Sequence, residues 1–180
     1  AIEARAGELL EEVTRLIAAA HDGDEAAAEQ SLTAMIAAWH DVNAIFDRMP
    51  ERCDPYIYFH RVRPWIHGWK DNPALGEGLV YEGVAETGGQ PQAFRGQTGS
   101  QSSIVPTIDA LLSVGHAADP LRTFLDELHI YRPPEHRRFI EDVRAASHVR
   151  PFIEGAGHKA LKTLYNDNVR QLARFRTRHL

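Results

Sequence analysis

Hydrophobic residues recur at three- and four-residue spacing along most of the chain, which predicts amphipathic helices. One such stripe runs through residues 2–17, with Glu and Arg opposite it, and the same period resumes over residues 32–49. Gly23 and Asp24 separate the two runs, as a turn glycine and an acidic N-cap candidate. We therefore expect two antiparallel helices.

Proline marks the next elements. Pro50 ends the second helix, and Asp54 followed by Pro55 is a cap and first-turn signal for a third helix that continues to Ile66. Pro64 lies inside this third helix, where it removes one backbone hydrogen bond and clashes with the preceding turn. We expect a kink there.

The helical period disappears between residues 70 and 100, where glycine recurs. A loop of this length is usually functional or disordered. Ser102 or Ser103 then caps a further helix, and Asp119-Pro120 opens another. Shorter helices are expected over residues 139–143 and 149–153, before a glycine break.

The last helix carries an apolar stripe that ends at His179. Its members are Leu161, Leu164, Tyr165, Asn168, Leu172, Phe175 and His179. No segment has the alternating pattern of a strand. The sequence therefore predicts an all-α fold, a multi-helix bundle with a long glycine-rich loop, over residues 1–180.

Composition narrows the class of protein. The chain has 180 residues, a formal net charge of −5 and one cysteine, Cys53. This size suits one domain, the negative charge argues against a nucleic-acid partner, and no apolar stretch reaches the roughly 20 residues that span a membrane. A single cysteine and no leader pattern favour the cytoplasm. The chain begins without Met and ends within helical pattern, so we expect a fragment.

The ten histidines do not have the spacing of a zinc site, since neither an HExxH nor a CxxC pattern occurs. His179 is different because Arg176 lies one turn before it on nearly the same face. An imidazole on an apolar stripe can coordinate a haem iron, while a guanidinium meets a carboxylate at the porphyrin edge. The plain alternative is a packed histidine beside a solvated arginine.

A second candidate group lies at the predicted kink. Arg63 follows Phe59 by four residues and Tyr58 by five, so an α-helix would bring the Phe59 ring close to the guanidinium. Aromatic rings and a bidentate cation could hold an aromatic amino acid. The alternative is core aromatics and a surface cation. Residues 94–100 could wrap a cofactor closely, or form an ordinary flexible loop.

Several motifs in register resemble the indoleamine 2,3-dioxygenase family, as a bacterial-type member. They are YFHRVRPWIHGW at 58–69, NP at 72–73, GLVYEG at 78–83, QSS at 101–103, YRPPEHR at 131–137 and FRTRH at 175–179. The resemblance implies a helical domain that holds haem b. It also implies a reaction in which ferrous iron binds O2 and both oxygen atoms enter the indole 2,3-bond of L-tryptophan or a related indoleamine, giving N-formylkynurenine.

The resemblance also implies residue roles. At the haem, His179 would be the proximal iron ligand, Arg176 would meet a propionate, and Thr98 and Gly99 would lie over the haem edge. At the substrate, Arg63 would bind the carboxylate, and Tyr58 and Phe59 would border the indole pocket. The chain departs from the mammalian enzymes at Tyr58, where they have Phe. We expect the family's small N-terminal domain and C-terminal helices to lie outside this fragment.

Three other functions remain open at this stage. The first is a related haem enzyme of the pyrrolnitrin-pathway type, which rearranges a tryptophan derivative. The second is a haem-binding or haem-sensing protein without turnover, and the third is a helical scaffold without cofactor. His136 is the competing axial ligand. The pattern does not indicate an oligomeric state.

Overall fold

The computed structural model describes residues 1–115 and 120–179, except for the side chains of residues 120–122 and 179. Within these residues no strand forms, and only two isolated bridges occur, Gly68 to Arg95 and Leu79 to Gln92. The α-helices are α1 (Ile2–Asp22), α2 (Glu25–Asp47), α3 (Pro55–Ile57), α4 (Arg63–Ile66), α5 (Ile104–Leu111), α6 (Pro120–His129), α7 (Pro134–Ala146), α8 (Val149–Gly155) and α9 (Lys159–His179). The predicted all-α class is confirmed.

Shorter helical turns connect these elements. A π-helical turn, Tyr58–Val62, joins α3 to α4, and four 3-10 turns lie at Met49–Glu51, Pro73–Leu75, Ala85–Thr87 and Gly99–Gln101. The chain divides into two compact units. We call them the helical unit, Ala1–Met49 with Ser102–Leu180, and the loop unit, Pro50–Gln101.

The boundary between α1 and α2 forms as the sequence predicts. Gly23 has a φ of 71°, the left-handed conformation that ends many helices, and its N–H donates to the Ala19 carbonyl. The Asp24 carboxylate then accepts a 2.9 Å hydrogen bond from the Ala27 N–H at the start of α2. Two local signals thus fix the turn that sends α2 back along α1.

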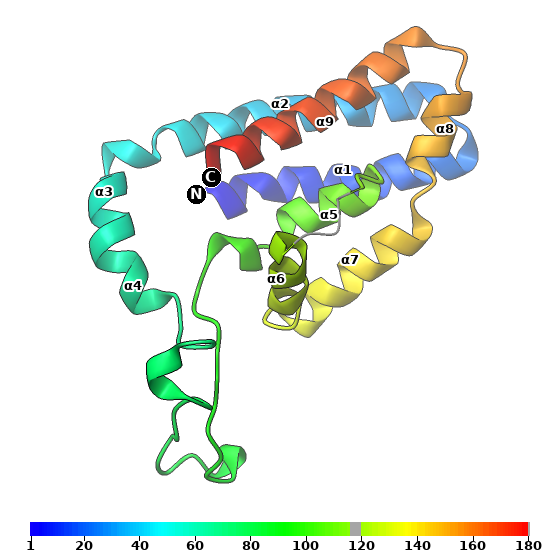
Figure 1. Ribbon diagram of the computed structural model, residues 1–180. Helices are drawn as coiled ribbons and strands as arrows, with labels where there is room; N and C mark the ends of the chain where they lie inside the picture. The colour runs from blue at the N-terminus through cyan, green and yellow to red at the C-terminus, as the bar shows by residue number, and fades with distance from the viewer. Residues whose placement is uncertain (116–119, 180) are drawn as a thin grey trace. The chain divides into compact units, whose positions relative to one another are not determined.

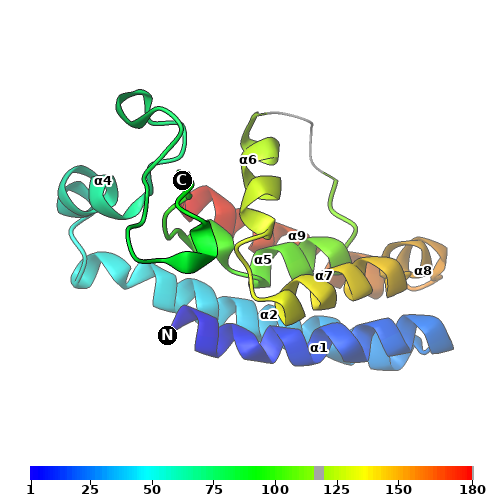
Figure 2. The ribbon, with the colours of Figure 1, turned by 90° about the horizontal axis from the view of Figure 1, so that it is seen from below.

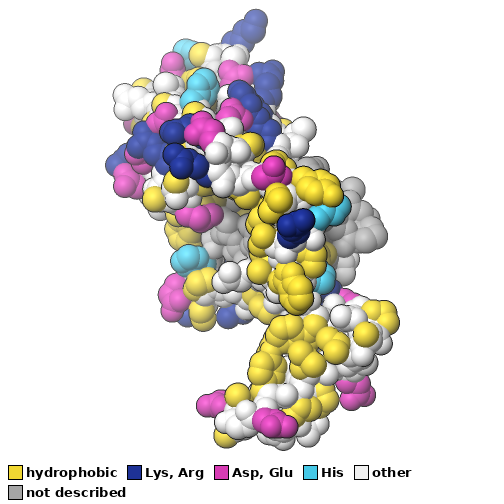
Figure 3. Space-filling view, turned by 90° about the vertical axis from the view of Figure 1, so that its left-hand side faces the viewer, with side chains coloured by type: hydrophobic (Ala, Val, Ile, Leu, Met, Phe, Trp, Pro, Cys, Tyr) yellow, Lys and Arg dark blue, Asp and Glu magenta, His cyan; other side chains and the backbone are white. Residues whose placement is uncertain are grey.

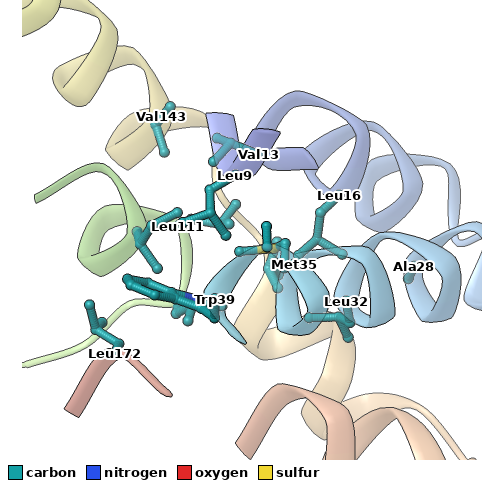
Figure 4. Close-up of a cluster of buried hydrophobic side chains, with 14 of the residues drawn as sticks. Leu9, Val13, Leu16, Ala28, Leu32, Met35, Trp39, Leu111, Val143 and Leu172 are labelled. Atoms are coloured by element: carbon teal, nitrogen blue, oxygen red, sulfur yellow. The ribbon is translucent and has the colours of Figure 1, made fainter. Parts of the chain in front are cut away.

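In the helical unit, α2 packs against both α1 and α9, and α1 also contacts α5 and α8 (Figures 1 and 2). Their apolar stripes meet in one core, part of which Figure 4 labels. Its largest fully buried side chains include Trp39, Leu9, Leu16, Leu32, Met35, Leu111 and Leu172. The predicted stripes are therefore the faces that these helices bury.

Two buried asparagines align α2 with α9. Asn168 is fully buried on α9, and its amide donates 3.0 Å bonds to the carbonyls of Leu32 and Leu164. Asn43 on α2 donates across the same interface to Gln171, at 3.2 Å. Buried polar groups must be hydrogen-bonded, so these contacts favour one register of the two helices.

Of the two serines predicted as alternative caps of α5, Ser102 accepts a bond from the start of the helix and Ser103 does not. Ser103 precedes the helix, but its backbone is already helical and its hydroxyl lies 3.0 Å from His136 Nδ1. Ser102 instead accepts a 3.3 Å bond from the Ile104 N–H. The Ser103 cap is wrong because a contact with α7 takes its hydroxyl. Asp119, the predicted cap of α6, lies outside the described residues.

The loop unit folds around a small aromatic cluster. The rings of Trp69, Tyr81 and Phe94 lie 6.0–6.2 Å apart in all three pairings, and the Trp69 indole N–H donates to the Gln92 carbonyl at 2.8 Å. Gly96 lets two backbone segments touch, since a Cβ there would lie 1.9 Å from the Ile66 carbonyl oxygen. Because glycine has no side chain, the backbone can pack closely at Gly96.

None of the helices in the described part of the chain is long and apolar enough to cross a membrane.

Candidate functional site

The segment around Pro64 is a helix widened by one π turn. The Arg63 N–H donates to the Tyr58 carbonyl, five residues earlier, where an α-helix would use Phe59. A π turn loosens the backbone just before Pro64, whose ring would otherwise press on the preceding turn. The expected kink is thus accommodated by a π turn, and such turns are frequent at functional sites.

This π turn corrects the predicted register of the aromatic and cationic side chains. We expected Phe59 and Arg63 to face each other at α-helical spacing. In the structure Arg63 is in register with Tyr58, and the Phe59 ring makes an edge contact with His60, with ring centroids 5.0 Å apart. Tyr58, Phe59 and Arg63 lie on one segment, as predicted. The aromatic residue one helical turn before Arg63 is Tyr58, however, and not Phe59.

Large hydrophobic side chains of this segment are exposed within the loop unit, and Figure 3 shows hydrophobic surface on this side of the molecule. They are Tyr56, Ile57, Tyr58, Phe59, Val62, Trp65 and Ile66. Phe59 is 66% and Tyr58 38% exposed, so neither is the core aromatic of the plain alternative. Arg63 is half-buried, and no carboxylate among the described residues pairs with it. Exposed rings beside such a cation suit an aromatic carboxylate ligand.

Thr98 and Gly99 lie at the start of the 3-10 turn that closes the loop unit. The Thr98 hydroxyl accepts a 3.4 Å bond from the Ser100 N–H, which leaves its own O–H able to donate. The amide of Gln101 donates to the Gly96 carbonyl at 3.1 Å and holds the turn closed. Thr98 is half-buried and Gly99 exposed, so a ligand can reach both.

The end of α9 is held by aromatic packing and by an ion pair. Phe175 lies between Trp39 and Phe46, with ring centroids 5.8 and 5.1 Å away. Arg176 pairs with Asp109 of α5, and the side chains are 32% and 16% exposed, respectively. His179 closes α9 one turn later, and its side chain lies outside the described residues.

Sequence reasoning missed Asp109. The sequence does contain a signal for it, because Asp109 is the single carboxylate of α5, whose other residues are apolar or carry a hydroxyl. A charge in such a segment is costly to bury without a partner. The guanidinium of Arg176 carries five N–H donors, so the contact with Asp109 leaves its chemistry compatible with a second carboxylate. Such a second carboxylate is what a porphyrin edge presents.

The competing ligand His136 is exposed on α7, and its Nδ1 is engaged by the Ser103 hydroxyl. Nearby, His129 Nδ1 accepts from Arg132 at 3.1 Å, and its Nε2 lies 3.5 Å from Glu141. Among the described residues, no group of three His, Cys, Asp or Glu side chains could hold a metal ion by itself.

These observations test whether the residues present fit haem. The stripe of α9 is buried at Leu161, Asn168 and Leu172 and half-buried at Phe175. The half-buried guanidinium of Arg176 lies in the last turn of the same helix. An apolar face and a cation that can meet a propionate are features that a haem site requires, and the described part of α9 has both.

We expect Asp109→Asn to destabilise the helical unit by about 1–3 kcal/mol, because it removes the negative charge that Arg176 of α9 meets on α5. Urea unfolding measures the change. Asp41→Asn is the matched control, since its ion pair with Arg5 is exposed and should cost less than about 1 kcal/mol. Equal costs at the two positions would contradict the importance of the Arg176 pair.

Comparison with known proteins identifies the family. The family model described as indoleamine 2,3-dioxygenase matches residues 1–180. The chain belongs to the indoleamine 2,3-dioxygenase family. It is 35% identical to indoleamine 2,3-dioxygenase 1 of Rattus norvegicus over 181 residues, which covers 99% of this chain and 44% of the rat protein. It is also 31% identical to 6-hydroxytryptophan 2,3-dioxygenase fscD of Fusarium equiseti, over 100% of this chain and 44% of that protein.

A third relative in the family is indoleamine 2,3-dioxygenase nanC of Aspergillus nanangensis, 30% identical over 100% of this chain and 45% of its own length. The chain thus spans less than half the length of these relatives. Within the family assignment, the residues predicted to bind substrate belong to the loop unit, and those predicted to hold the iron and a propionate belong to the helical unit.

Proposed function

We propose that this chain is part of a haem-dependent dioxygenase that inserts both atoms of O2 into the indole 2,3-bond of L-tryptophan or a related indoleamine, giving N-formylkynurenine. The observation that carries the proposal is the match of the whole chain to the indoleamine 2,3-dioxygenase family. Haem b, when bound, supplies the O2-activating iron chemistry. A small indole is the partner proposed, and the single cysteine is compatible with the cytoplasm.

The chain's own residues would bind and orient the substrate. Arg63 would hold the carboxylate through two parallel N–H donors, and its lack of a carboxylate partner among the described residues supports that role. Tyr58, one π turn before Arg63, and Phe59 would border the indole, since their rings are exposed. Fixing the carboxylate and the ring together orients the indole 2,3-bond toward the reacting oxygen.

His179 would coordinate the iron and Arg176 would meet a propionate, with Asp109 holding the guanidinium in place. Thr98 and Gly99 would lie over the haem edge, where the Thr98 hydroxyl can donate a proton in a hydrogen bond. The exposed rings of the loop unit need an apolar cover to exclude water from such a reaction.

The name of the Fusarium relative suggests a variation in substrate. Tyr58 adds a hydroxyl at the edge of the proposed indole pocket, and a hydroxylated indole would give that group a hydrogen-bonding partner. We therefore include hydroxytryptophan among the related indoleamines to be assayed.

The test is a product assay on the full-length protein, supplied with haem, reductant, O2 and L-tryptophan. N-formylkynurenine supports dioxygenation, and a rearranged product without both oxygen atoms would favour the pyrrolnitrin-pathway type instead. Incorporation of both atoms from labelled O2 distinguishes the two outcomes. A protein that retains haem but shows no turnover with any indole would support haem binding or sensing, and one with no Soret band would favour the scaffold.

Arg63→Ala is expected to lower kcat/KM for L-tryptophan roughly 100-fold, because losing one partner of a desolvated charge pair costs about 2–5 kcal/mol. Arg61→Ala, two residues earlier and exposed, is the matched control and should change kcat/KM less than about threefold. If both variants behave alike, Arg63 does not bind the substrate carboxylate.

A further inference from the structure

The helical unit contains a pocket that the proposed reaction does not use. It has a volume of about 390 Å³ and is lined by the turn that follows α5, by α8 and by the first half of α9. Ligand pockets in proteins have volumes of about 300–1,000 Å³. This one is far along α9 from His179, since its lining ends at Val169.

The inner wall of the pocket is apolar. Leu112 and Ile153 are fully or nearly fully buried beneath it, and Tyr165 and Val169 line it while partly buried. The Tyr165 hydroxyl donates to the Leu112 carbonyl, which fixes the ring against the wall. Burial raises the pKa of Tyr165, so the hydroxyl stays protonated and keeps donating near neutral pH.

The rim of the pocket is charged. Arg150 forms an ion pair with Glu154 on the same helix, and the distance from Arg150 Nε to Glu154 Oε1 is 2.9 Å. Lys162 lines the pocket from α9, and among the described residues no carboxylate pairs with it. One ion pair and one further ammonium leave a net positive charge at the mouth, next to the exposed amide of Asn166.

The turn after α5 also lines the pocket. Ser113, two residues after the last residue of α5, has a φ of 51°, and the next residue, Val114, donates its N–H to the Asp109 carbonyl at 3.0 Å. This is the left-handed cap that ends many helices, and it fixes the backbone on this side of the pocket.

We propose that this pocket binds a small amphipathic carboxylate, with a one-ring or two-ring apolar body against Tyr165 and Val169 and its carboxylate at Lys162. The apolar wall supplies affinity and the ammonium selects the anion. The pocket is separate from the residues proposed for tryptophan oxidation, so the inference goes beyond that function and does not rest on it.

The test is fluorine NMR of this chain with 4-fluorobenzoate and, separately, with neutral 4-fluorobenzamide, which has nearly the same shape. The benzoate should bind about fivefold more tightly than the amide, the ratio expected for a partly exposed ion pair. Lys162→Met should abolish this preference, and Lys159→Met, an equal loss of charge on the exposed start of α9, should preserve it.

Val169→Phe should reduce the binding of both probes at least about tenfold by filling the pocket, with helical circular dichroism as the check on folding. If that variant does not fold, the two lysine variants decide. Equal binding of the two probes by the unmodified chain, or equal effects of the two lysine variants, would overturn the proposal. Arg63→Ala should leave probe binding unchanged, which separates this pocket from the proposed tryptophan site.

Discussion

Replacing His179 with alanine is expected to abolish the Soret band of the full-length protein after haem reconstitution and gel filtration. The proposed function gives the axial bond to this imidazole, and Arg176, one turn before it, would then retain only the proposed propionate contact. A surface contact of that kind holds haem far less firmly than an iron–imidazole bond. Dioxygenase activity with L-tryptophan should fall to background in the same preparation.

His136→Ala is the control for that experiment. His136 is exposed, lies on α7 and contacts Ser103, so its loss should leave the Soret band and the activity within about twofold of the unmodified protein. If His136→Ala removes the band and His179→Ala keeps it, the axial ligand is wrongly assigned. Adding imidazole to the His179→Ala protein should partly restore the spectrum, because the cavity left can hold the free ligand.

The sequence predicts the helical unit well because its signals are local. The period of apolar residues marks α1, α2 and α9, and the structure buries those same stripes. Gly23 and Asp24 end one helix and begin the next through bonds that reach only a few residues along the chain. Interactions of such short range depend little on the rest of the fold.

The candidate site was only partly predictable because its details depend on tertiary contacts and on an unusual turn. Asp109 and Arg176 are 67 residues apart, and no local pattern pairs them. The π turn moves Arg63 from register with Phe59 to register with Tyr58, although both spacings are equally compatible with the sequence. Helical periodicity assumes 3.6 residues per turn and therefore fails at a turn of different width.

The glycine-rich loop shows the same limit. Its glycines indicate irregular backbone, but the pattern does not reveal that Trp69, Tyr81 and Phe94 gather into a cluster of their own. Nor does it separate Gly96, which permits backbone contact inside the loop unit, from Gly99, which is exposed at the start of a turn. A glycine's use depends on what approaches it in space.

Trp39→Ala is expected to destabilise the helical unit by about 3–5 kcal/mol, the usual cost of removing a fully buried aromatic side chain. Trp39 is 0% exposed and its ring lies 5.8 Å from that of Phe175, so the cavity would open directly beneath the end of α9. Urea unfolding followed by circular dichroism measures the loss. The same variant should also retain haem poorly, because Arg176 and His179 follow Phe175 on the loosened turn.

Trp65→Ala is the matched control for Trp39→Ala, since it removes the same side chain from a position that is 87% exposed. Its free energy of unfolding should change by less than about 0.5 kcal/mol, as for most surface substitutions. Equal destabilisation by both variants would mean that Trp65 is covered in solution by contacts beyond those of its own segment. A loss below about 1 kcal/mol at Trp39 would mean that α9 does not depend on the aromatic packing that places its last turn.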